Sequence, residues 1–389
     1  MRSGRLVFAQ LMDWFPKYPF NRIVDRWGGN YRVRNFSCMD QFMAMAFAQL
    51  AGRESLRDIQ LCLTSFKSKL YHAGLRGNAP RSTLADANQL RPWQIWEELA
   101  QIQIARARRL YAGEDLGLDL DNTVYALDST TIDLCLELFP WASFRRAKAA
   151  VKLHTLMDLR GNLPTTVHIT HGRVADVRIM DRLSYEAGAI YVFDRAYIDF
   201  ARLWRLHQSR AWFVTRTKKN FDRKWLSSNP VDKTTGIRCD QTISLGGILV
   251  SEYYPDRLRR ISLVDPETGK RLTFLTNNFQ LPAHIIAALY KLRWRVELFF
   301  KWIKQHLRIK TFFGTSENAV RTQLWIAITV YVQVAILKKE LQLEMPLYWI
   351  LQLLSLNLFE KTPIFELLTK PELTLDLDDD RRQLTLFDL

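Results

Sequence analysis

"NTVYALDST", residues 122–130, marks the point where the chain changes from a helical to an extended pattern. The apolar residues before Asp128 are typical of a buried strand, and Gly161-Asn162 predicts a turn between two of the strands that follow. A further short strand ends at Asp194 and leads into a helix. These later segments read TIDLCLEL, VKLHTLMDL, TTVHITHG, AIYVFDRAY and DFARLWRLHQ. Strands combined with helices indicate an α/β core that begins near residue 119.

A second group of extended segments lies between residues 210 and 281. Its members read AWFVTRT, GILVSEYY, RRISLVD and RLTFLTN, with a turn at 266–269 between the last two. We expect this stretch to be a β-rich insertion in the core. A helix over 282–312 follows, and helices continue to about residue 370. The predicted architecture is therefore a mixed sheet with an insertion, flanked by α-helical N- and C-terminal regions.

The first 118 residues are predicted to be helical. Bulky residues recur every three or four positions over 1–75, and a clearer helical segment starts near Pro80 and should be divided by Pro92. Residues 1–110 hold 17 Lys and Arg against 8 Asp and Glu, a net of +9. We interpret 1–75 as a DNA-binding region and 76–118 as a linker that also contacts DNA. A solvated basic face is an equal alternative, because no clear helix-turn-helix pattern is present.

The charge of the whole chain narrows the classes of partner. Its 389 residues carry a net charge of +15, which favours a polyanion, DNA first and an anionic membrane surface second. The longest apolar run, 324–337, is shorter than a spanning helix, so we expect no membrane partner.

Four scattered cysteines and the absence of a recognisable secretory signal fit a reducing cytoplasm. No glycine-rich phosphate loop is present, which argues against ATP use.

Asp128 and Asp194 each follow an apolar strand segment. Carboxylates at strand ends emerge at the edge of a sheet, where open α/β folds bind their ligands. Aspartate is also a common turn residue, so for either residue alone a local structural role is the favoured explanation.

The segment YKLRWRVELFFKWIKQHLRIK, residues 290–310, combines a bulky apolar surface with one narrow polar stripe. At about 100° per residue, the side chains of the stripe lie within roughly 60° of one another. They are Tyr290, Arg293, Glu297 and Lys304, with Lys301 near the same line. The alternative interpretation is that this stripe is the solvent-facing side of an ordinary amphipathic helix. Such a stripe seldom has aromatic residues close on both sides.

Asp128, Asp194 and Glu297 together supply the carboxylates that a two-metal phosphoryl-transfer site requires. Oxygen ligands suit Mg²⁺ or Mn²⁺. Two ions about 4 Å apart activate the attacking oxygen and stabilise the leaving oxygen. Arg293 and Lys304 would then bind substrate phosphates.

The spacing Y-x2-R-x3-E-x6-K within this helix resembles the signature of bacterial DDE transposases of the insertion-sequence-four group. In this chain it consists of Tyr290, Arg293, Glu297 and Lys304. The resemblance extends to RWRVE around the glutamate, to LDSTTIDL around Asp128, to FDRAYIDF around Asp194, and to STLADANQLR upstream. It covers about residues 80–310 and, more loosely, the helical N-terminus. All three acidic positions match.

This resemblance implies a ribonuclease H-like core over 119–209, interrupted by the insertion at 210–281 and completed by the 282–312 helix with its catalytic glutamate. Asp128, Asp194 and Glu297 would bind two divalent ions. Enzymes of this group bind the inverted-repeat ends of an insertion sequence, hydrolyse a strand to free a 3′-OH, and join it to target DNA, usually as a homodimer on paired ends. The resemblance also implies that Tyr290, Arg293 and Lys304 contact the DNA backbone near the cut, and that the protein acts in the bacterial cytoplasm, at the nucleoid.

Two pairs of residues near the predicted site have open interpretations. Trp294 and Lys301 would suit stacking and backbone contacts near a cleaved DNA end, whereas core packing is the ordinary role of a tryptophan. Lys152 and His154 share one face of a strand, either beside the metal site or as an ordinary strand pair.

The C-terminal segment, 371–389, follows the helical region 313–370 and carries six acidic and two basic residues. It contains QLTLF, which resembles the short peptide by which bacterial proteins bind the replicative sliding clamp. Its Leu and Phe side chains would insert into an apolar pocket of that partner. The alternative is a tail that folds back on the protein. The predicted contact residues are Gln383, Leu384, Leu386 and Phe387.

Two other functions compete with transposition. A metal-dependent nuclease on the same core would cleave DNA without joining it. A DNA-binding protein that had lost catalysis would only occupy the ends of the element, but the presence of all three acidic residues argues against this.

Overall fold

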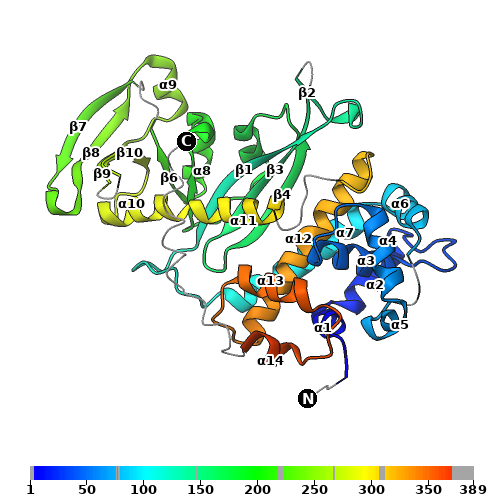
Figure 1. Ribbon diagram of the computed structural model, residues 1–389. Coiled ribbons are helices and arrows are strands. Elements are labelled where there is room, and N and C mark those ends of the chain that lie inside the picture. Colours follow the sequence, from blue (N-terminus) through cyan, green and yellow to red (C-terminus); the bar gives the residue numbers. More distant parts are fainter. Residues whose placement is uncertain are drawn as a thin grey trace.

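The computed structural model describes residues 4–75, 77, 79–145, 148–217, 222–265, 268–305 and 312–369. Within these residues, a large mixed sheet lies beside a bundle of helices (Figure 1). The predicted α/β class, with helical N- and C-terminal regions, is confirmed.

The first half of the sheet is the core that positions the site. Three antiparallel strands lie in the order β4-β3-β1, and β1 then pairs in parallel with β5, which pairs in parallel with β6. This order and these directions are those of a ribonuclease H-like core, as predicted. The strands are β1 (Val124–Leu134), β3 (Lys148–Asp158), β4 (Leu163–His171), β5 (Ile190–Phe193) and β6 (Trp212–Arg216).

The β-rich segment extends the same sheet. β10 pairs with β6, and β9, β8 and β7 follow in antiparallel order toward one edge, while β2 pairs with β3 at the other side (Figure 1). These strands are β2 (Ser143–Arg145), β7 (Arg223–Asn229), β8 (Ile237–Leu245), β9 (Leu258–Val264) and β10 (Arg271–Thr276).

Two strand predictions were wrong. GILVSEYY was predicted as a strand, but Ile248–Tyr253 is a helix, α9, because Gly247 adopts a left-handed φ of 80° that ends the extended path of β8. VYALDST and TIDLCLEL were predicted as separate strands, whereas β1 is one continuous strand, since β3 pairs with it from Tyr125 to Leu134. Asp128 therefore lies within a strand and not at its end.

The segments before and after the sheet form one helical bundle. α12 (Glu317–Glu340) runs through it and packs on α7 (Gln94–Tyr111), α3 (Cys38–Leu50) and α6 (Arg81–Leu90). α6 ends and α7 begins on either side of Pro92, as predicted. The N-terminal and C-terminal helical regions meet in the bundle, where Phe66 stacks on Phe359 with ring centroids 4.1 Å apart. The remaining bundle helices are α1 (Val7–Leu11), α2 (Lys17–Arg26), α4 (Leu56–Ser65), α5 (Lys67–Leu70), α13 (Leu347–Asn357) and α14 (Ile364–Thr369).

Among the described helices, α12 is the one long and apolar enough to cross a membrane by length and composition. Of its most apolar stretch, 94% is buried against the rest of the protein. Its apolar surface is therefore used for packing within the bundle.

Different elements cover the two faces of the core sheet. α10 (Ala283–Leu292) contacts β5 and β6, and α11 (Trp294–Gln305) contacts β1. The opposite face packs on α8 (Phe200–Gln208), which was predicted, and on two short 3₁₀ helices, η4 (Asp176–Arg182) and η5 (Arg195–Tyr197). The other 3₁₀ helices are η1 (Met12–Trp14), η2 (Tyr71–Ala73), η3 (Pro140–Ala142) and η6 (Lys233–Thr235).

Candidate active site

Two aspartates lie where β1 and β5 stop pairing. The last pair in their parallel register is Leu127 with Phe193, so Asp128 is the next residue of β1 and Asp194 is the residue directly after β5. Adjacent strands lie about 5 Å apart, so the two aspartates lie close together. Asp194 also begins η5, where its carboxylate accepts a hydrogen bond from the Ala196 N–H at 2.7 Å.

The third predicted acid comes from a helix that is not continuous. The predicted 282–312 helix divides at Arg293 into α10 and α11. Around the junction, the Arg293 N–H donates to the Tyr290 carbonyl and the Val296 N–H donates to the Arg293 carbonyl, both three residues back along the chain. This tighter turn alters the direction of the Arg293 side chain relative to an ideal α-helix.

α11 is fixed on the sheet by apolar and polar contacts. Val296 and Ile303 are fully buried, and the Arg295 guanidinium donates to the Leu159 carbonyl at 3.0 Å. These contacts place Glu297 in the first turn of α11, over β1.

Arg293 connects the strand acid to the helix acid. Its two terminal nitrogens lie 2.6 Å from Asp128 Oδ2 and 2.6 Å from Glu297 Oε1. The Arg293 side chain is 15% exposed and that of Asp128 is 17% exposed, whereas Glu297 is 47% exposed. The guanidinium also lies 5.7 Å from the centre of the Tyr290 ring.

The buried position of Asp128 changes its ionisation. Burial raises the pKa of Asp128 to about 6, although Arg293 and the Ser129 N–H favour the ionised form. The nearby carboxylates of Asp194 and Glu297 make a smaller contribution to this rise in pKa. The three predicted acids are therefore close enough to affect one another electrostatically.

The residues fit a divalent ion in chemistry, but not in their present arrangement. Carboxylate oxygens are the ligands that Mg²⁺ and Mn²⁺ prefer. Across the described ranges, however, no three carboxylate, histidine or cysteine side chains are grouped closely enough to hold an ion. Arg293 supplies the positive charge between Asp128 and Glu297, where a metal ion would supply it.

The predicted DNA-contacting residues lie along α10 and α11. Tyr290 is partly buried against Phe274, with ring centroids 5.1 Å apart, and burial raises its pKa. Trp294 is 38% exposed, Lys301 is exposed and Lys304 is half-buried. Tyr290 and Arg293 therefore lie beside the carboxylates, whereas Lys304 lies two turns beyond Glu297.

Lys152 and His154 do not contribute to this group. His154 pairs with Ser129 in the register of β1 and β3, and side chains alternate along a strand, so His154 lies on the opposite face from Asp128. There, Lys152 and the Ser129 hydroxyl contact Asp176 at 3.0 Å and 2.8 Å. Asp176 was not predicted, and its position in η4 follows no sequence pattern that we can identify.

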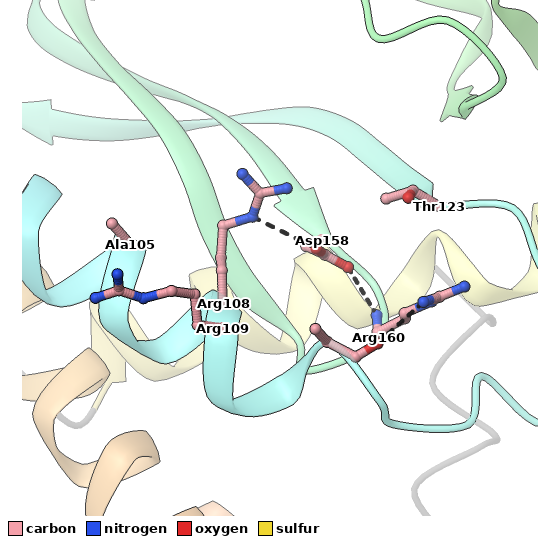
Figure 2. Close-up of a pocket in the computed structure, with 7 residues that line it drawn as sticks. Ala105, Arg108, Arg109, Thr123, Asp158 and Arg160 are labelled. Atoms are coloured by element: carbon pink, nitrogen blue, oxygen red, sulfur yellow. Dashed lines mark hydrogen bonds and ion pairs between the residues drawn. The ribbon is translucent and has the colours of Figure 1, made fainter.

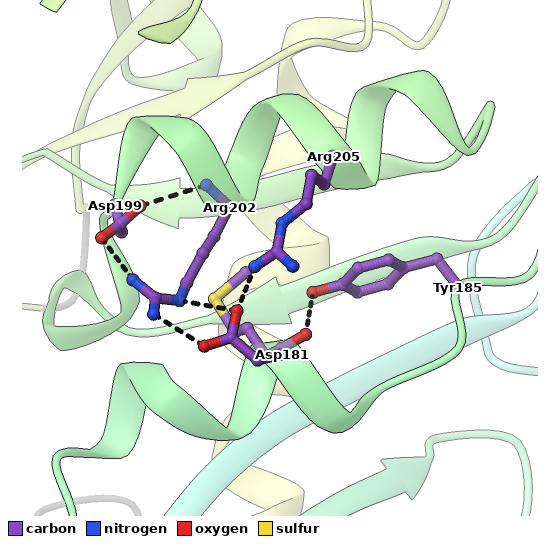
Figure 3. Close-up of polar contacts among 6 residues, drawn as sticks. Asp181, Tyr185, Asp199, Arg202 and Arg205 are labelled. Carbon is purple, nitrogen blue, oxygen red and sulfur yellow. Dashed lines mark hydrogen bonds and ion pairs between the residues drawn. The ribbon is translucent and has the colours of Figure 1, made fainter.

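An ion-pair network supports the segment that follows Asp194. Arg202 of α8 binds Asp181 of η4 at 2.7 Å and Asp199 at 2.6 Å, and Arg205 also contacts Asp181 (Figure 3). These arginines, with Arg202 the larger effect, lower the pKa of Asp181. The network holds η4 against α8, and α8 follows directly from the 3₁₀ turn that Asp194 begins.

The predicted clamp-binding residues lie outside the described residues. They are Gln383, Leu384, Leu386 and Phe387.

Comparisons with known proteins point to one family. The transposase DDE domain family matches residues 119–333, and a domain of unknown function matches residues 3–76. The chain is 33% identical to a Sinorhizobium fredii protein named as the transposase y4zB, over 72% of this chain and 78% of that protein. It is 32% identical to a Geobacillus stearothermophilus protein named as a transposase for an insertion sequence element, over 64% of this chain and 65% of that protein.

Among solved structures, a piggyBac transposase synaptic complex with hairpin DNA is 12% identical, with a TM-score of 0.47, over 97% of this chain and 85% of that chain. A likeness at this level is too low to transfer any property to the chain.

Proposed function

The chain belongs to the transposase DDE domain family, and on this premise we propose that Asp128, Asp194 and Glu297 are the catalytic carboxylates with which it cuts and joins DNA. The family implies metal-dependent cleavage and strand transfer in cut-and-paste transposition. The DNA would be the inverted-repeat ends of an insertion sequence and, after cleavage, the target into which the 3′-OH ends are joined.

One observation carries the assignment of the acids. Asp128 and Asp194 directly follow the last registered pair of the parallel strands β1 and β5, and Glu297 is joined to Asp128 through Arg293. Residues from three separate parts of the chain thus meet at one point of the sheet. All three are carboxylates, the ligands that Mg²⁺ and Mn²⁺ prefer, and we propose that they would hold two ions.

The bound ions would supply charge that activates the attacking oxygen and stabilises the leaving oxygen. Asp128, Asp194 and Glu297 would hold them. For this, the Arg293 guanidinium has to leave the carboxylates, and a DNA phosphate is the natural acceptor for its paired N–H groups. Arg293 would then bind the backbone near the cut, with the Tyr290 ring beneath it.

Further DNA contacts are proposed along α11 and in the N-terminal region. Lys301 and Lys304 lie on α11 beyond Glu297, where a strand leaving the site would pass, and Trp294 is the first residue of α11, next to Arg293. Their roles are backbone contact for the lysines and stacking for Trp294.

In the N-terminal region, the outer face of α2 is the best candidate for DNA contact. α3 is almost wholly buried, so it cannot enter a groove as a recognition helix. By contrast, α2 exposes Lys17, Tyr18 and Arg22, and the following loop exposes Tyr31 with Arg32 lying 5.1 Å from its ring. This surface supports the proposal that residues 1–75 bind DNA, with 76–118 as a contacting linker.

Three further elements of the proposal concern assembly and location. The active form would be a homodimer on paired ends, acting at the nucleoid in the cytoplasm. Residues 383–387 would bind the sliding clamp. Deleting residues 383–389 tests the last point, since unchanged clamp affinity would contradict it.

The central experiment uses the purified chain, Mg²⁺ and supercoiled DNA that carries the two candidate ends. Wild type is compared with Glu297→Ala and with Asp232→Ala, which removes an exposed carboxylate that caps the distant η6. Cleavage at the ends with joined products, lost in Glu297→Ala and retained in Asp232→Ala, is the expected result. Cleavage without joining would instead identify a nuclease, and binding without cleavage would identify an inactive DNA-binding protein. Cleavage that survives in Glu297→Ala would show that the acid is wrongly assigned.

A further inference from the structure

A pocket of about 430 Å³ lies between α7 and the turn that follows β3 (Figure 2). Thr123, which lines it, precedes Asp128 by five residues, or roughly 16 Å along an extended strand. Asp158, another lining residue, pairs with Tyr125, whose side chain points to the opposite face from Asp128. The pocket is thus separate from the carboxylates of the candidate active site.

Positive charge dominates the lining of this pocket. Three arginines and one aspartate contribute a net charge of +2, and the other lining residues are uncharged: Arg108, Arg109, Arg160 and Asp158, with Ala105, Ala112 and Thr123. Asp158 lies 3.6 Å from Arg108 Nε, so it offsets only one of the three guanidinium groups.

Arg108 retains hydrogen-bonding capacity. One terminal nitrogen donates to the Tyr125 hydroxyl at 2.7 Å, while Nε is buried and has no hydrogen-bond partner among the described residues. Nε faces the Asp158 carboxylate in an ion pair at 3.6 Å, which is longer than a hydrogen bond, so the protein satisfies the Arg108 guanidinium only in part. In Figure 2, Arg108 extends from α7 toward Asp158, while the Arg109 side chain leaves the same helix in another direction.

The walls of the pocket are fixed before any ligand binds. The Arg160 guanidinium donates to the carbonyls of Ala112 at 3.0 Å and Asp121 at 2.6 Å. A Cβ atom at Gly161 would lie 2.7 Å from the Tyr111 ring, so the turn sits directly on the end of α7. Such a fixed arrangement lowers the entropy lost on binding.

The turn is also joined to the helix of the candidate active site. Leu159 lies between the lining residues Asp158 and Arg160, and its carbonyl accepts the Arg295 hydrogen bond from α11. Occupancy of the pocket would therefore stabilise the same turn that helps to hold α11 in place.

We propose that this pocket binds a phosphate group, supplied by the DNA backbone at a point away from the cut. Guanidinium groups bind phosphate through paired N–H donors, and the Thr123 hydroxyl adds a neutral donor. The choice of DNA as the source rests on the proposed function. Free inorganic phosphate shares the same chemistry and is separated from DNA by the test.

The first arm of the test measures the dissociation constant of a short linear duplex against KCl concentration. Arg109→Gln is compared with wild type and with Arg257→Gln, which makes the same charge change at an exposed site in the β-rich segment. Losing one phosphate contact should lower the salt-dependence slope by about 0.9 in Arg109→Gln and leave it unchanged in Arg257→Gln. An unchanged slope in Arg109→Gln, or an equal change in both variants, overturns DNA binding at the pocket.

The second arm measures thermal unfolding of the same proteins in inorganic phosphate and in chloride at equal ionic strength. Greater stabilisation of wild type than of Arg109→Gln by phosphate, without a slope difference on DNA, assigns the pocket to free phosphate. If wild type and Arg109→Gln do not differ in either arm, the whole proposal is overturned. If folded wild type does not join DNA strands, the proposed function is refuted. The phosphate arm still tests the pocket in that case, because it does not depend on strand joining.

Discussion

Arg293 donates to Asp128 across a separation of 165 residues, with 2.6 Å between Nη1 and Oδ2. The pair joins the helix junction to the middle of β1, and both side chains are largely buried. An arginine in this position serves as the counter-ion of the carboxylates, so the acids can be held together before metal and DNA arrive. If the acids bind metal as proposed, a metal ion would compete with Arg293 for the same oxygens.

Replacing Arg293 tests this competition. Arg293→Gln should lower the free energy of unfolding by about 2–4 kcal/mol without metal, because it leaves Asp128 buried without its ion-pair partner. Mn²⁺ should restore more stability to the variant than it adds to wild type. Urea unfolding with and without Mn²⁺ measures both effects.

The matched control is Arg26→Gln, which breaks an exposed ion pair with Glu98. It should change the unfolding free energy by less than about 1 kcal/mol and leave the response to Mn²⁺ as in wild type. Equal stabilisation of Arg293→Gln and wild type by Mn²⁺ would show that Arg293 does not compete with the ion.

The raised pKa of Asp128 predicts how stability depends on pH. Because burial raises this pKa to about 6, the folded protein binds the proton more tightly than the unfolded chain does. The contribution of Asp128 to stability is therefore fully present at acidic pH below the unfolded pKa, and is lost as the pH rises to about 6. Urea unfolding of the metal-free proteins across this pH range should show this pH dependence of stability in wild type and not in Asp128→Asn.

Metal binding should show the opposite trend. The carboxylate must lose its proton before it can bind an ion, so Mn²⁺ affinity should decrease below about pH 6. Titration calorimetry at several pH values measures this. An affinity that stays constant from about pH 5 to about pH 7 would contradict the role of Asp128 as a ligand.

Local patterns in the sequence were sufficient to place Asp194 and Glu297 in their elements, but not to place Asp128 within β1 or to show the surroundings of the acids. Asp194 follows four apolar strand residues, and Glu297 recurs at helical spacing with Tyr290, so each can be assigned to its element without knowledge of the fold. The contact between Arg293 and Asp128 depends on how α11 crosses β1, which no local pattern specifies.

Other differences have equally physical causes. All residues of β7 are exposed, so the strand has no apolar alternation that would reveal it in the sequence. The short apolar run at 248–253 suits a strand or a helix equally, and Gly247 decided between them. Asp176 comes close to Ser129 only through the packing of η4 behind the sheet.

Removing a carboxylate should separate DNA cleavage from DNA binding. Asp194→Asn should reduce cleavage by about a thousandfold, because loss of a metal ligand removes several kcal/mol of transition-state stabilisation. Its affinity for an end-containing duplex should equal or exceed that of wild type, since a negative charge near the phosphates is removed. Gel-shift and cleavage assays on the same DNA measure the two effects. A parallel loss of affinity and cleavage would indicate that the variant is misfolded or that Asp194 supports DNA binding instead.

The packing of the β3–β4 turn on α7 can be tested by adding a single methyl group at Gly161. Gly161→Ala would place Cβ 2.7 Å from the Tyr111 ring, and the ring cannot easily withdraw because its hydroxyl donates to the Ala335 carbonyl at 2.9 Å. The variant should lose about 1–3 kcal/mol of unfolding free energy through overpacking. Gly113→Ala is the matched control, because nothing lies within 4 Å of a Cβ added there. It should be neutral or slightly stabilising, since alanine reduces the entropy of the unfolded chain. If the two variants unfold at the same urea concentration, the turn is not packed on Tyr111, and the wall of the arginine-lined pocket is not fixed by this contact.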